Sequence, residues 1–462
     1  MNDVSNPGGT ATSKSSGAEA PGEGAIAALE MPPPSAGAVS AFQTADRPRW
    51  EDYSRCVHCG LCLNVCPTFR LLGEEMDSPR GRIYQIAQAD AGRIGLDELR
   101  MHLERCLDCR ACETACPSGV QYGRILEAAR AELAARPAGS ALRRRLRHYL
   151  FARVLPSRGR IRFYAALLAA AQRSGLEAFG RRSGLLRALG LEPAARLAPA
   201  VSRPVFHSEI GRTFPARGDR RARVVLLAGC IQNVFCAPLN RAALGVLQAN
   251  GCEVSLPAGQ TCCGALHVHA GERETARRLA RQNLAAFNPG DYDAIVTAAA
   301  GCGSALKEYG DLLAGDERAR AFAAKVRDIT EFLAALGMRA EGLRPLPVSV
   351  TFQDACHLAH GQRIRSAPRE LLRAVPGLKL VEMRRADQCC GSAGIYNLEQ
   401  PEIAVRLLEE KMELVAETGA AWLVTANPGC QLQLQAGVRA AGRSQPVLHV
   451  VELLARAYGL NE

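Results

Sequence analysis

The chain is organised around a cysteine-rich stretch, Cys56-Val57-His58-Cys59-Gly60-Leu61-Cys62-Leu63-Asn64-Val65-Cys66-Pro67. The same spacing returns as Cys106-Leu107-Asp108-Cys109-Arg110-Ala111-Cys112-Glu113-Thr114-Ala115-Cys116-Pro117. We call these two stretches the first run and the second run. In each run, three cysteines are separated by two residues and a fourth follows after three more. The proline behind the fourth cysteine ends the tight loop and turns the chain outward.

The spacing C-x2-C-x2-C-x3-C-P is typical of ferredoxins that bind two cubane iron–sulfur clusters. Three closely spaced thiolates can surround one compact cluster, whereas the fourth points away and reaches the cluster of the other run. We therefore expect one 4Fe–4S cluster on Cys56, Cys59, Cys62 and Cys116, and a second on Cys106, Cys109, Cys112 and Cys66.

Other uses of clustered cysteines fit these runs less well. A disulfide framework is typical of small secreted domains, and the N-terminus shows no signal peptide. Structural zinc needs only two C-x2-C pairs, so the third cysteine and the proline of each run would be surplus. Eighteen cysteines without a secretory signal indicate a reducing compartment, and we expect a cytoplasmic protein.

The net charge of +11 is concentrated in one segment of the chain. Residues 136–223 hold 20 arginines and no lysine, against four acidic residues. No nucleic-acid-binding module accompanies this segment, so we expect no nucleic-acid partner. A helical connector with a solvated face is the simplest interpretation, and an acidic partner or anionic lipid head groups are alternatives. Because no stretch approaches the roughly 18–20 apolar residues of a membrane span, we expect at most a peripheral contact with the inner membrane.

Composition and periodicity divide the N-terminal half into three parts. Residues 1–45 are rich in Gly, Ala, Ser and Pro without an apolar period, which is typical of a disordered tail. Helical patterns such as the one from Gln121 to Arg136 surround both runs, so residues 46–137 are predicted to form an α-helical ferredoxin domain. Residues 138–219 form the predicted arginine-rich helical connector.

An internal repeat occupies residues 220–345 and 346–462. In each copy a strand leads into a cysteine, a Cys-Cys-Gly triplet follows, and a second strand leads to a closing cysteine. The repeat cysteines are Cys230, Cys262, Cys263 and Cys302 in the first copy, and Cys356, Cys389, Cys390 and Cys430 in the second. We call these sets the first quartet and the second quartet. The remaining Cys236 and Cys252 are interpreted as ordinary semi-buried thiols.

The predicted fold is therefore a multidomain α+β chain, in which an α-helical ferredoxin domain with two 4Fe–4S clusters precedes two tandem α/β Cys-Cys-Gly repeat domains. Strands alternating with helices predict parallel sheets, whose functional groups gather at the carboxyl ends of the strands. We expect the two copies to face each other across a pseudo-two-fold axis, with each quartet gathered at one sheet edge.

The quartets are predicted to bind a cofactor, either a further iron–sulfur centre or a reactive thiol centre, with structural zinc or inert core cysteines as alternatives. Adjacent cysteines followed by glycine bring two thiols near one point while the backbone turns tightly. His267, His269 and His357 are candidate ligands or proton carriers near these cysteines. Residues 307–309, which follow Cys302, are interpreted as helix-face residues.

From about Tyr53 to the C-terminus, the sequence resembles the iron–sulfur subunit of bacterial glycolate oxidase. The stretches that carry the resemblance are Cys56-Val57-His58-Cys59-Gly60, Ser78-Pro79-Arg80-Gly81-Arg82-Ile83-Tyr84, Arg105-Cys106-Leu107, Gly301-Cys302-Gly303, Lys307-Glu308-Tyr309-Gly310, Cys389-Cys390-Gly391-Ser392-Ala393-Gly394 and Val424-Thr425-Ala426-Asn427. The wider group with paired Cys-Cys-Gly domains includes lactate-utilisation proteins, the electron-transfer subunit of anaerobic glycerol-3-phosphate dehydrogenase, and heterodisulfide reductase subunits. Heterodisulfide reductase repeats close with C-x2-C, whereas Cys302 and Cys430 stand alone, so the non-cubane clusters of that family are not carried over.

The resemblance implies an oxidoreductase complex in which separate FAD-containing flavoprotein subunits oxidise glycolate to glyoxylate. This chain would pass the electrons to quinone or another acceptor, and we expect it to have no catalytic residues and no dehydrogenase activity alone. No G-x-G-x-x-G follows a strand, so FAD is expected only in the partner subunits. The alternatives are an electron-transfer subunit of a lactate or glycerol-3-phosphate dehydrogenase, and a thiol–disulfide reductase that works at the Cys-Cys-Gly pairs.

Overall fold

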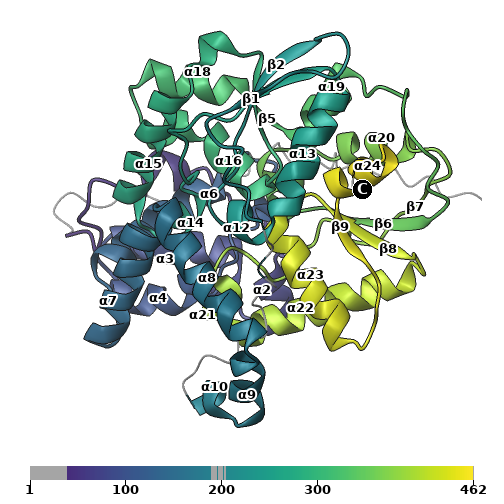
Figure 1. Cartoon of the computed structure of the whole chain (residues 1–462). Helices are drawn as coiled ribbons and strands as arrows, with labels where there is room; N and C mark the ends of the chain where they lie inside the picture. The colour runs from purple at the N-terminus through teal and green to yellow at the C-terminus, as the bar shows by residue number, and fades with distance from the viewer. Residues whose placement is uncertain (1–38, 189–194, 196–200, 202–203, 461–462) are drawn as a thin grey trace, which may run out of the picture.

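The structure, a computed structural model, describes residues 39–188, 195, 201 and 204–460. It combines a helical N-terminal part with two α/β units, so the prediction of an α+β chain is confirmed (Figure 1). The predicted tail falls mostly on residues 1–38, outside the described residues. Its last residues differ from the prediction, because Phe42 is 2% exposed in the N-terminal core and the backbone amide of Thr44 donates to Glu132.

Short helices surround the two cysteine runs. They are α1 (Trp50–Tyr53), α2 (Pro67–Leu72), η1 (Glu75–Asp77), α3 (Pro79–Asp90), α4 (Leu96–Glu104), α5 (Ala111–Thr114) and α6 (Tyr122–Ala135). Helix α3 begins where the Ser78 side chain accepts a hydrogen bond from the Gly81 amide, with a proline in its first turn. Helix α6 buries Ile125 and Leu126 against Ile86, which fixes both runs on one core.

The part of the connector before residue 189 consists mainly of helices. It contains α7 (Ala141–Tyr149), the π-helical segment η2 (Leu150–Val154), α8 (Arg158–Arg173), α9 (Leu176–Arg182) and α10 (Leu185–Ala188). Figure 1 shows α9 and α10 projecting from the lower edge of the molecule. Among the helices that the structure describes, none combines the length and the apolar composition that a bilayer crossing requires.

The two repeats form two sheets of matching strand order. The first contains β1 (Thr213–Phe214), β2 (Ala222–Leu226), β3 (Cys252–Ser255), β4 (Ala294–Thr297) and β5 (Val326–Asp328), and the second contains β6 (Ser349–Gln353), β7 (Lys379–Val381), β8 (Trp422–Thr425) and β9 (Val447–His449). The orders are β1-β3-β2-β4-β5 and β7-β6-β8-β9. All pairs are parallel except that of β1 with β3, so β1 is an antiparallel addition to an otherwise equivalent first sheet.

Helices cover both sheets. In the first repeat they are α12 (Ile231–Phe235), α13 (Ala237–Ala249), α14 (Ala265–His269), α15 (Arg273–Ala286), η3 (Pro289–Asp291), α16 (Ala300–Lys307), α17 (Tyr309–Leu312), α18 (Glu317–Lys325) and α19 (Ile329–Leu336). In the second they are the π-helical η4 (His357–Gly361), α20 (Ser366–Arg373), α21 (Tyr396–Glu399), α22 (Pro401–Glu417), α23 (Pro428–Ala440) and α24 (Val450–Ala457).

The repeats share one hydrophobic core, in which Val224 and Leu247 of the first pack with Phe352 and Leu453 of the second. Helix α13 packs on α24, and α19 packs on α20. Helices α13 and α20 follow the equivalent strands β2 and β6, and α19 and α24 follow the equivalent strands β5 and β9. Exchanging the two repeats therefore converts the contact of α13 with α24 into that of α20 with α19. A pseudo-two-fold axis produces such an exchange.

Candidate metal centres

The two cysteine runs follow the same backbone path. His58 and Asp108, at the third position of each run, both have a φ of 53°. Gly60 has a φ of 84°, and Arg110 at the equivalent position has a φ of 59°. Left-handed backbone at a residue other than glycine costs free energy, so the second run holds Arg110 in place through other contacts. The repeated turns give the two cysteine loops matching backbone shapes.

The fourth cysteine of each run lies close to the thiols of the other run. Burial raises the pKa of Cys109, and the neighbouring Cys66 thiol raises it further. Burial likewise raises the pKa of Cys56, and among the charges that add to this effect is Cys116. Cys66 also acts on Cys62, so its thiol lies between the runs. This proximity is compatible with cross-ligation, which stays a prediction.

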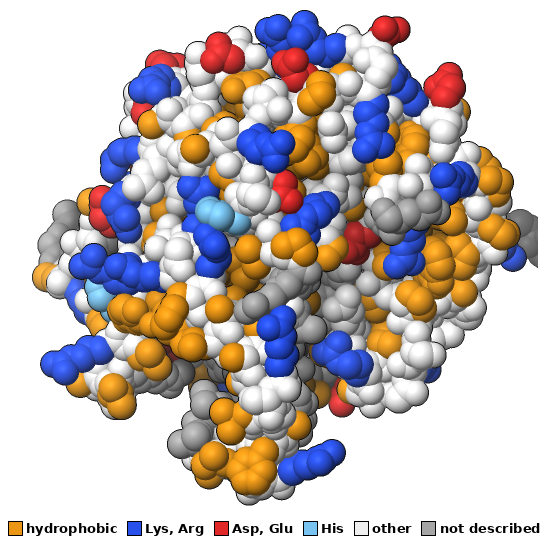
Figure 2. All heavy atoms as spheres, in the orientation of Figure 1, with side chains coloured by type: hydrophobic (Ala, Val, Ile, Leu, Met, Phe, Trp, Pro, Cys, Tyr) orange, Lys and Arg blue, Asp and Glu red, His pale blue; other side chains and the backbone are white. Residues whose placement is uncertain are grey.

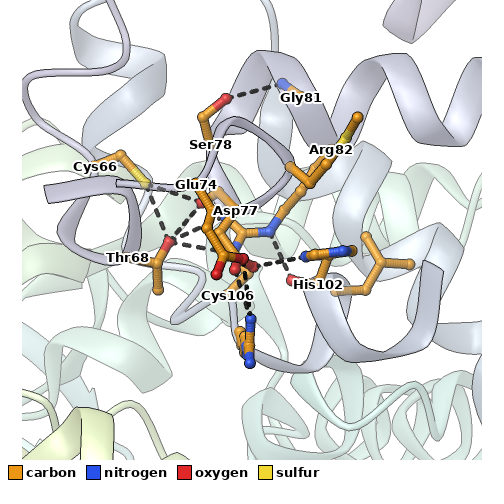
Figure 3. Close-up of polar contacts among 12 residues, drawn as sticks. Cys66, Thr68, Glu74, Asp77, Ser78, Gly81, Arg82, His102 and Cys106 are labelled. Atoms are coloured by element: carbon orange, nitrogen blue, oxygen red, sulfur yellow. Dashed lines mark hydrogen bonds and ion pairs between the residues drawn. The ribbon is translucent and has the colours of Figure 1, made fainter. Parts of the chain in front are cut away.

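A buried network ties the Cys66 side of this site to the second run (Figure 3). The Asp77 carboxylate is fully buried and accepts hydrogen bonds from Arg82 at 3.1 Å and from Arg105 at 2.8 Å. The Asp77 carbonyl accepts a hydrogen bond from Thr68 Oγ1 at 2.8 Å. Thr68 Oγ1 in turn lies 3.3 Å from the Cys66 sulfur. Two guanidinium groups already neutralise the Asp77 carboxylate. Its charge is therefore balanced without a metal ion.

Arg82 is the cation at the centre of this network, and its side chain is fully buried. Its guanidinium donates to Thr68 Oγ1 and to the carbonyl of His102. Burial alone would lower the pKa of Arg82, but the thiols of Cys106 and Cys66 help to raise it. A fixed positive charge thus lies beside two cysteines that we assign to one cluster. The stretch around Arg82 is one of those that resemble the glycolate oxidase subunit family. The sequence alone, however, indicates no role for this arginine.

The first quartet converges at one edge of its sheet. Cys230 follows β2, Cys302 lies in the first turn of α16 behind β4, and Cys262 and Cys263 precede α14. The sulfurs of Cys230 and Cys262 are 3.3 Å apart, and those of Cys263 and Cys302 are 3.1 Å apart. Gly264 then turns the backbone with a φ of 86°.

The second quartet repeats this arrangement, and all four of its cysteines are buried. Cys389 interacts by hydrogen bonding with Cys356 and Cys390, and Cys390 does so with Cys430. Gly391 has the same φ of 86° as its counterpart in the first repeat, and an added Cβ would lie 2.5 Å from a backbone oxygen. Only glycine therefore fits behind the cysteine pair.

Basic side chains lie near the second quartet. His357 Nδ1 is 3.6 Å from the Cys356 sulfur. The Lys411 side chain is fully buried and donates to two backbone carbonyls. Hydrogen bonds from Cys389 and Cys430 lower the pKa of Cys390, and the charge of Lys411 lowers it further. The second quartet therefore has a buried cation that lowers the pKa of one of its thiols.

The donor sets fit iron–sulfur chemistry. Thiolates are soft ligands that select iron–sulfur or zinc centres over harder metals, and both quartets offer converging, largely buried sulfurs. The eight cysteines of the runs offer the same donor type around two loops of equal shape. Cys236 and Cys252 are buried in the shared core and take part in neither quartet.

The second run and the second quartet are direct neighbours. Cys109 packs in one hydrophobic cluster with Cys356, Cys389 and Leu407. The Tyr396 hydroxyl donates to the carbonyl of Arg105 at 2.8 Å, which fixes α21 against the second run. A short, protein-filled path therefore connects the ferredoxin-like part with the second repeat.

A buried ionic network joins the second run to the first repeat. His269 Nδ1 lies 2.8 Å from Asp108 Oδ2, and Arg110 donates to Glu127 at 2.8 Å and to Glu308. Burial raises the pKa of Glu127 to about 8. Asp108, Glu127 and His269 could surround a metal ion, but the Arg110 guanidinium already supplies the positive charge.

A cavity of about 970 Å³ opens beside this network. Its lining includes Cys263 of the first quartet, His269 and His357, so the cavity lies where the two repeats and the helical part meet. His267 points elsewhere, because its Nε2 contacts the carbonyl of Phe151 at 2.8 Å. Of the three histidines suggested by the sequence, only His269 and His357 line this space.

The interpretation of residues 307–309 as helix-face residues was wrong in part. Tyr309 is fully buried, and its hydroxyl donates to the carbonyl of Cys263 at 2.9 Å. Glu308 forms the ion pair with Arg110 described above, and Lys307 pairs with Glu331. Tyr309 therefore helps to position the first quartet, and Glu308 joins the first repeat to the second run. In the sequence, only the resemblance of residues 307–310 to the subunit family could have indicated a role.

Three known families match four stretches of the chain. Residues 52–120 match a model described as a 4Fe-4S dicluster domain, and residues 224–307 and 350–435 match a cysteine-rich domain. Residues 142–198 match the linker region of the glycolate oxidase iron-sulfur subunit. The match to the linker covers the arginine-rich connector.

Curated relatives extend over most of the chain. A probable glycolate oxidase iron-sulfur subunit of Bacillus subtilis is 41% identical over 87% of this chain and 94% of its own length. The glycolate oxidase iron-sulfur subunit of Escherichia coli is 33% identical over 87% of this chain and 93% of its own length. Lactate utilization protein A of Geobacillus thermodenitrificans is 32% identical over 50% of this chain and 98% of its own length.

Proposed function

This chain belongs to the family of glycolate oxidase iron–sulfur subunits, and we propose that it carries electrons away from a flavoprotein subunit that oxidises glycolate to glyoxylate. The acceptor is a quinone or a comparable carrier. FAD is held by the partner, and the complex works on the cytoplasmic side of the cell.

The contact between the second run and the second quartet is the observation that carries this proposal. Electron transfer needs redox centres that lie close together inside protein, and Cys109 packs with Cys356 and Cys389. Two 4Fe–4S clusters would be held by Cys56, Cys59, Cys62 and Cys116, and by Cys106, Cys109, Cys112 and Cys66. When bound, they supply one-electron redox chemistry, and the two quartets are assigned as sites of further iron–sulfur or thiol chemistry.

The surrounding side chains have defined tasks in this proposal. Arg82 holds a fixed positive charge beside Cys66 and Cys106, two of the proposed ligands of one cluster. Lys411 does the same beside Cys390. Burial of the second run and the second quartet keeps water away from the ligands.

Lactate is a second candidate substrate for the complex, because the similarity to lactate utilization protein A covers 98% of that protein. We assign the choice between glycolate and lactate to the flavoprotein partner, since the described residues of this chain are proposed to carry electrons and not to bind the acid.

The test is to purify the full chain without oxygen, with and without its flavoprotein partner, and to follow reduction of an artificial acceptor by glycolate or lactate. We expect acceptor reduction only with both subunits, and about eight iron atoms from the two runs. Cys109→Ser should block transfer to the acceptor while the flavin is still reduced by the acid. Cys252→Ser is the matched control. Acid oxidation by this chain alone, or full transfer by the Cys109 variant, would overturn the proposal.

A further inference from the structure

The connector carries a large share of the exposed apolar side chains. Of the 19 large hydrophobic residues that are exposed among the described residues, ten lie between residues 142 and 185. They include Leu146, 66% exposed, Phe163, 59% exposed, and Phe179, 64% exposed. Exposed apolar residues that gather in one region mark an interaction site, whereas single ones are ordinary. We call the exposed side chains of α7, α8, α9 and α10 the connector surface.

The apolar side chains follow the helical period on two adjoining helices. Leu142, Leu146 and Tyr149 are spaced by four and three residues along α7, so they lie on one face. Tyr164 on α8 meets this face, because its hydroxyl lies 3.0 Å from the hydroxyl of Tyr149. Phe163 packs edge-on beside Tyr164. The stripes of α7 and α8 therefore form one surface.

The body of the protein fixes which face of α8 points outward. Ile161 and Ala165 are buried, and they pack with Val154 of η2 and Val234 of α12. The opposite face, with Phe163, is turned away from this core. The outward position of the apolar side chains is thus a consequence of packing on the other side of the helix.

The charge of this segment is strongly positive. Residues 142–185 contain 11 arginines, no lysine and one acidic residue, Glu177. Figure 2 shows hydrophobic and basic side chains side by side over α7 and α8 at the lower left, and over α9 and α10 at the bottom. Guanidinium groups bind phosphate through a planar pair of donors, which suits a surface of phosphodiester groups.

We propose that the connector surface binds an anionic phospholipid bilayer, with its Leu, Phe and Tyr side chains at the boundary of the acyl chains and its arginines on the phosphates. Arginine and apolar residues on the same helix are the composition of interfacial helices. Helices α9 and α10 project from the body, so a flat bilayer can reach them without steric conflict (Figure 1). This inference rests on the surface alone and does not depend on the substrate of the complex.

The experiment measures binding of the full, anaerobically purified chain to sedimented vesicles. One set contains phosphatidylcholine only, and the other contains phosphatidylcholine with phosphatidylglycerol. We expect binding to the anionic vesicles, weakened as salt rises, and at least about tenfold weaker binding to the neutral ones. Equal binding to both sets, or binding to neither, would overturn the proposal.

Variants assign the binding to the connector surface. Leu146→Glu with Phe179→Glu should lower the affinity for anionic vesicles by about tenfold or more, since acidic groups replace two apolar anchors. Met101→Glu with Val405→Glu is the control, because both residues are half exposed, lie outside the connector and add the same charge. If the two double variants bind equally, the lipid site lies elsewhere. If only binding of the flavoprotein partner is lost, the connector surface is a protein interface and the lipid proposal fails.

Discussion

Nδ1 of His269 lies 2.8 Å from Oδ2 of Asp108, which joins the loop of the second cysteine run to α14 of the first repeat. The same loop presents Arg110 to Glu127 of α6 and to Glu308, which directly follows α16. Asp108 and Arg110 both adopt left-handed backbone conformations, so these side chains leave the loop in fixed directions. The loop that is proposed to hold a cluster is therefore also the joint between the helical part and the first repeat.

Arg110→Met should destabilise the protein by about 3 kcal/mol or more, because it removes the buried cation that Asp108, Glu127 and Glu308 share. Denaturant unfolding under anaerobic conditions measures the loss. Arg124→Met is the control, since Arg124 pairs with Asp311 at the surface and such a pair contributes at most about 1 kcal/mol. Similar losses in both variants would contradict the assigned role of the network.

Cys66→Ser should perturb the cluster of the second run more than that of the first. The reason is that the Cys66 thiol lies among the thiols that act on Cys109 and Cys112. Electron paramagnetic resonance of the reduced protein can follow this change, with Cys236→Ser as a control in the core. A spectrum in which only the signal of the first run changes would refute cross-ligation.

Arg82→Met should lower the reduction potential of the cluster assigned to Cys106 and Cys66, because a nearby positive charge stabilises the reduced, more negative state. We expect a shift on the order of 50 mV for loss of one charge across several ångströms of protein. Redox titration monitored by paramagnetic resonance measures it. Arg82→Lys keeps the charge but loses the planar hydrogen bonds, so it should retain most of the potential. An unchanged potential in the Met variant would exclude the electrostatic role.

The strands that precede the quartet cysteines could be predicted, because β2, β4, β6 and β8 are apolar runs that end at a cysteine or a Cys-containing turn. Strands β3 and β5 could not be predicted. Strand β5 has three residues, and β3 has four with alternating burial. Neither is long enough for its hydrophobic pattern to be distinguished from a chance sequence. Their position depends on pairing with β4 and β2.

The thiols of each quartet could be expected to meet, because topology brings the ends of parallel strands together. The networks around them could not be expected in the same way. Arg110 and Glu308 are 198 residues apart, and their pairing depends on how the first repeat docks on the second run. Arg82 lies in a helix whose sequence gives no sign that a guanidinium is buried there.

Stability should fall as the pH decreases from about 6.5 toward 4, and His267 should contribute to this fall. Burial lowers the pKa of His267 to about 4, although its hydrogen bond to Phe151 opposes the shift. Below pH 6.5 the unfolded chain takes up a proton at this residue while the folded protein does not, so the lower pH stabilises the unfolded state and decreases the free energy of unfolding. The expected loss between pH 7 and pH 5 from this one group is about 1–2 kcal/mol.

His267→Gln tests this contribution, because glutamine can donate to the Phe151 carbonyl but does not titrate in this range. We expect the variant to unfold at similar denaturant concentrations to the native protein at pH 5.5, and to show a shallower dependence on pH between 7 and 5. His449, whose pKa burial also lowers to about 4, remains in the variant, so part of the dependence should persist. If the slopes of the variant and the native protein are equal, the pKa of His267 does not change on folding, and the prediction is wrong.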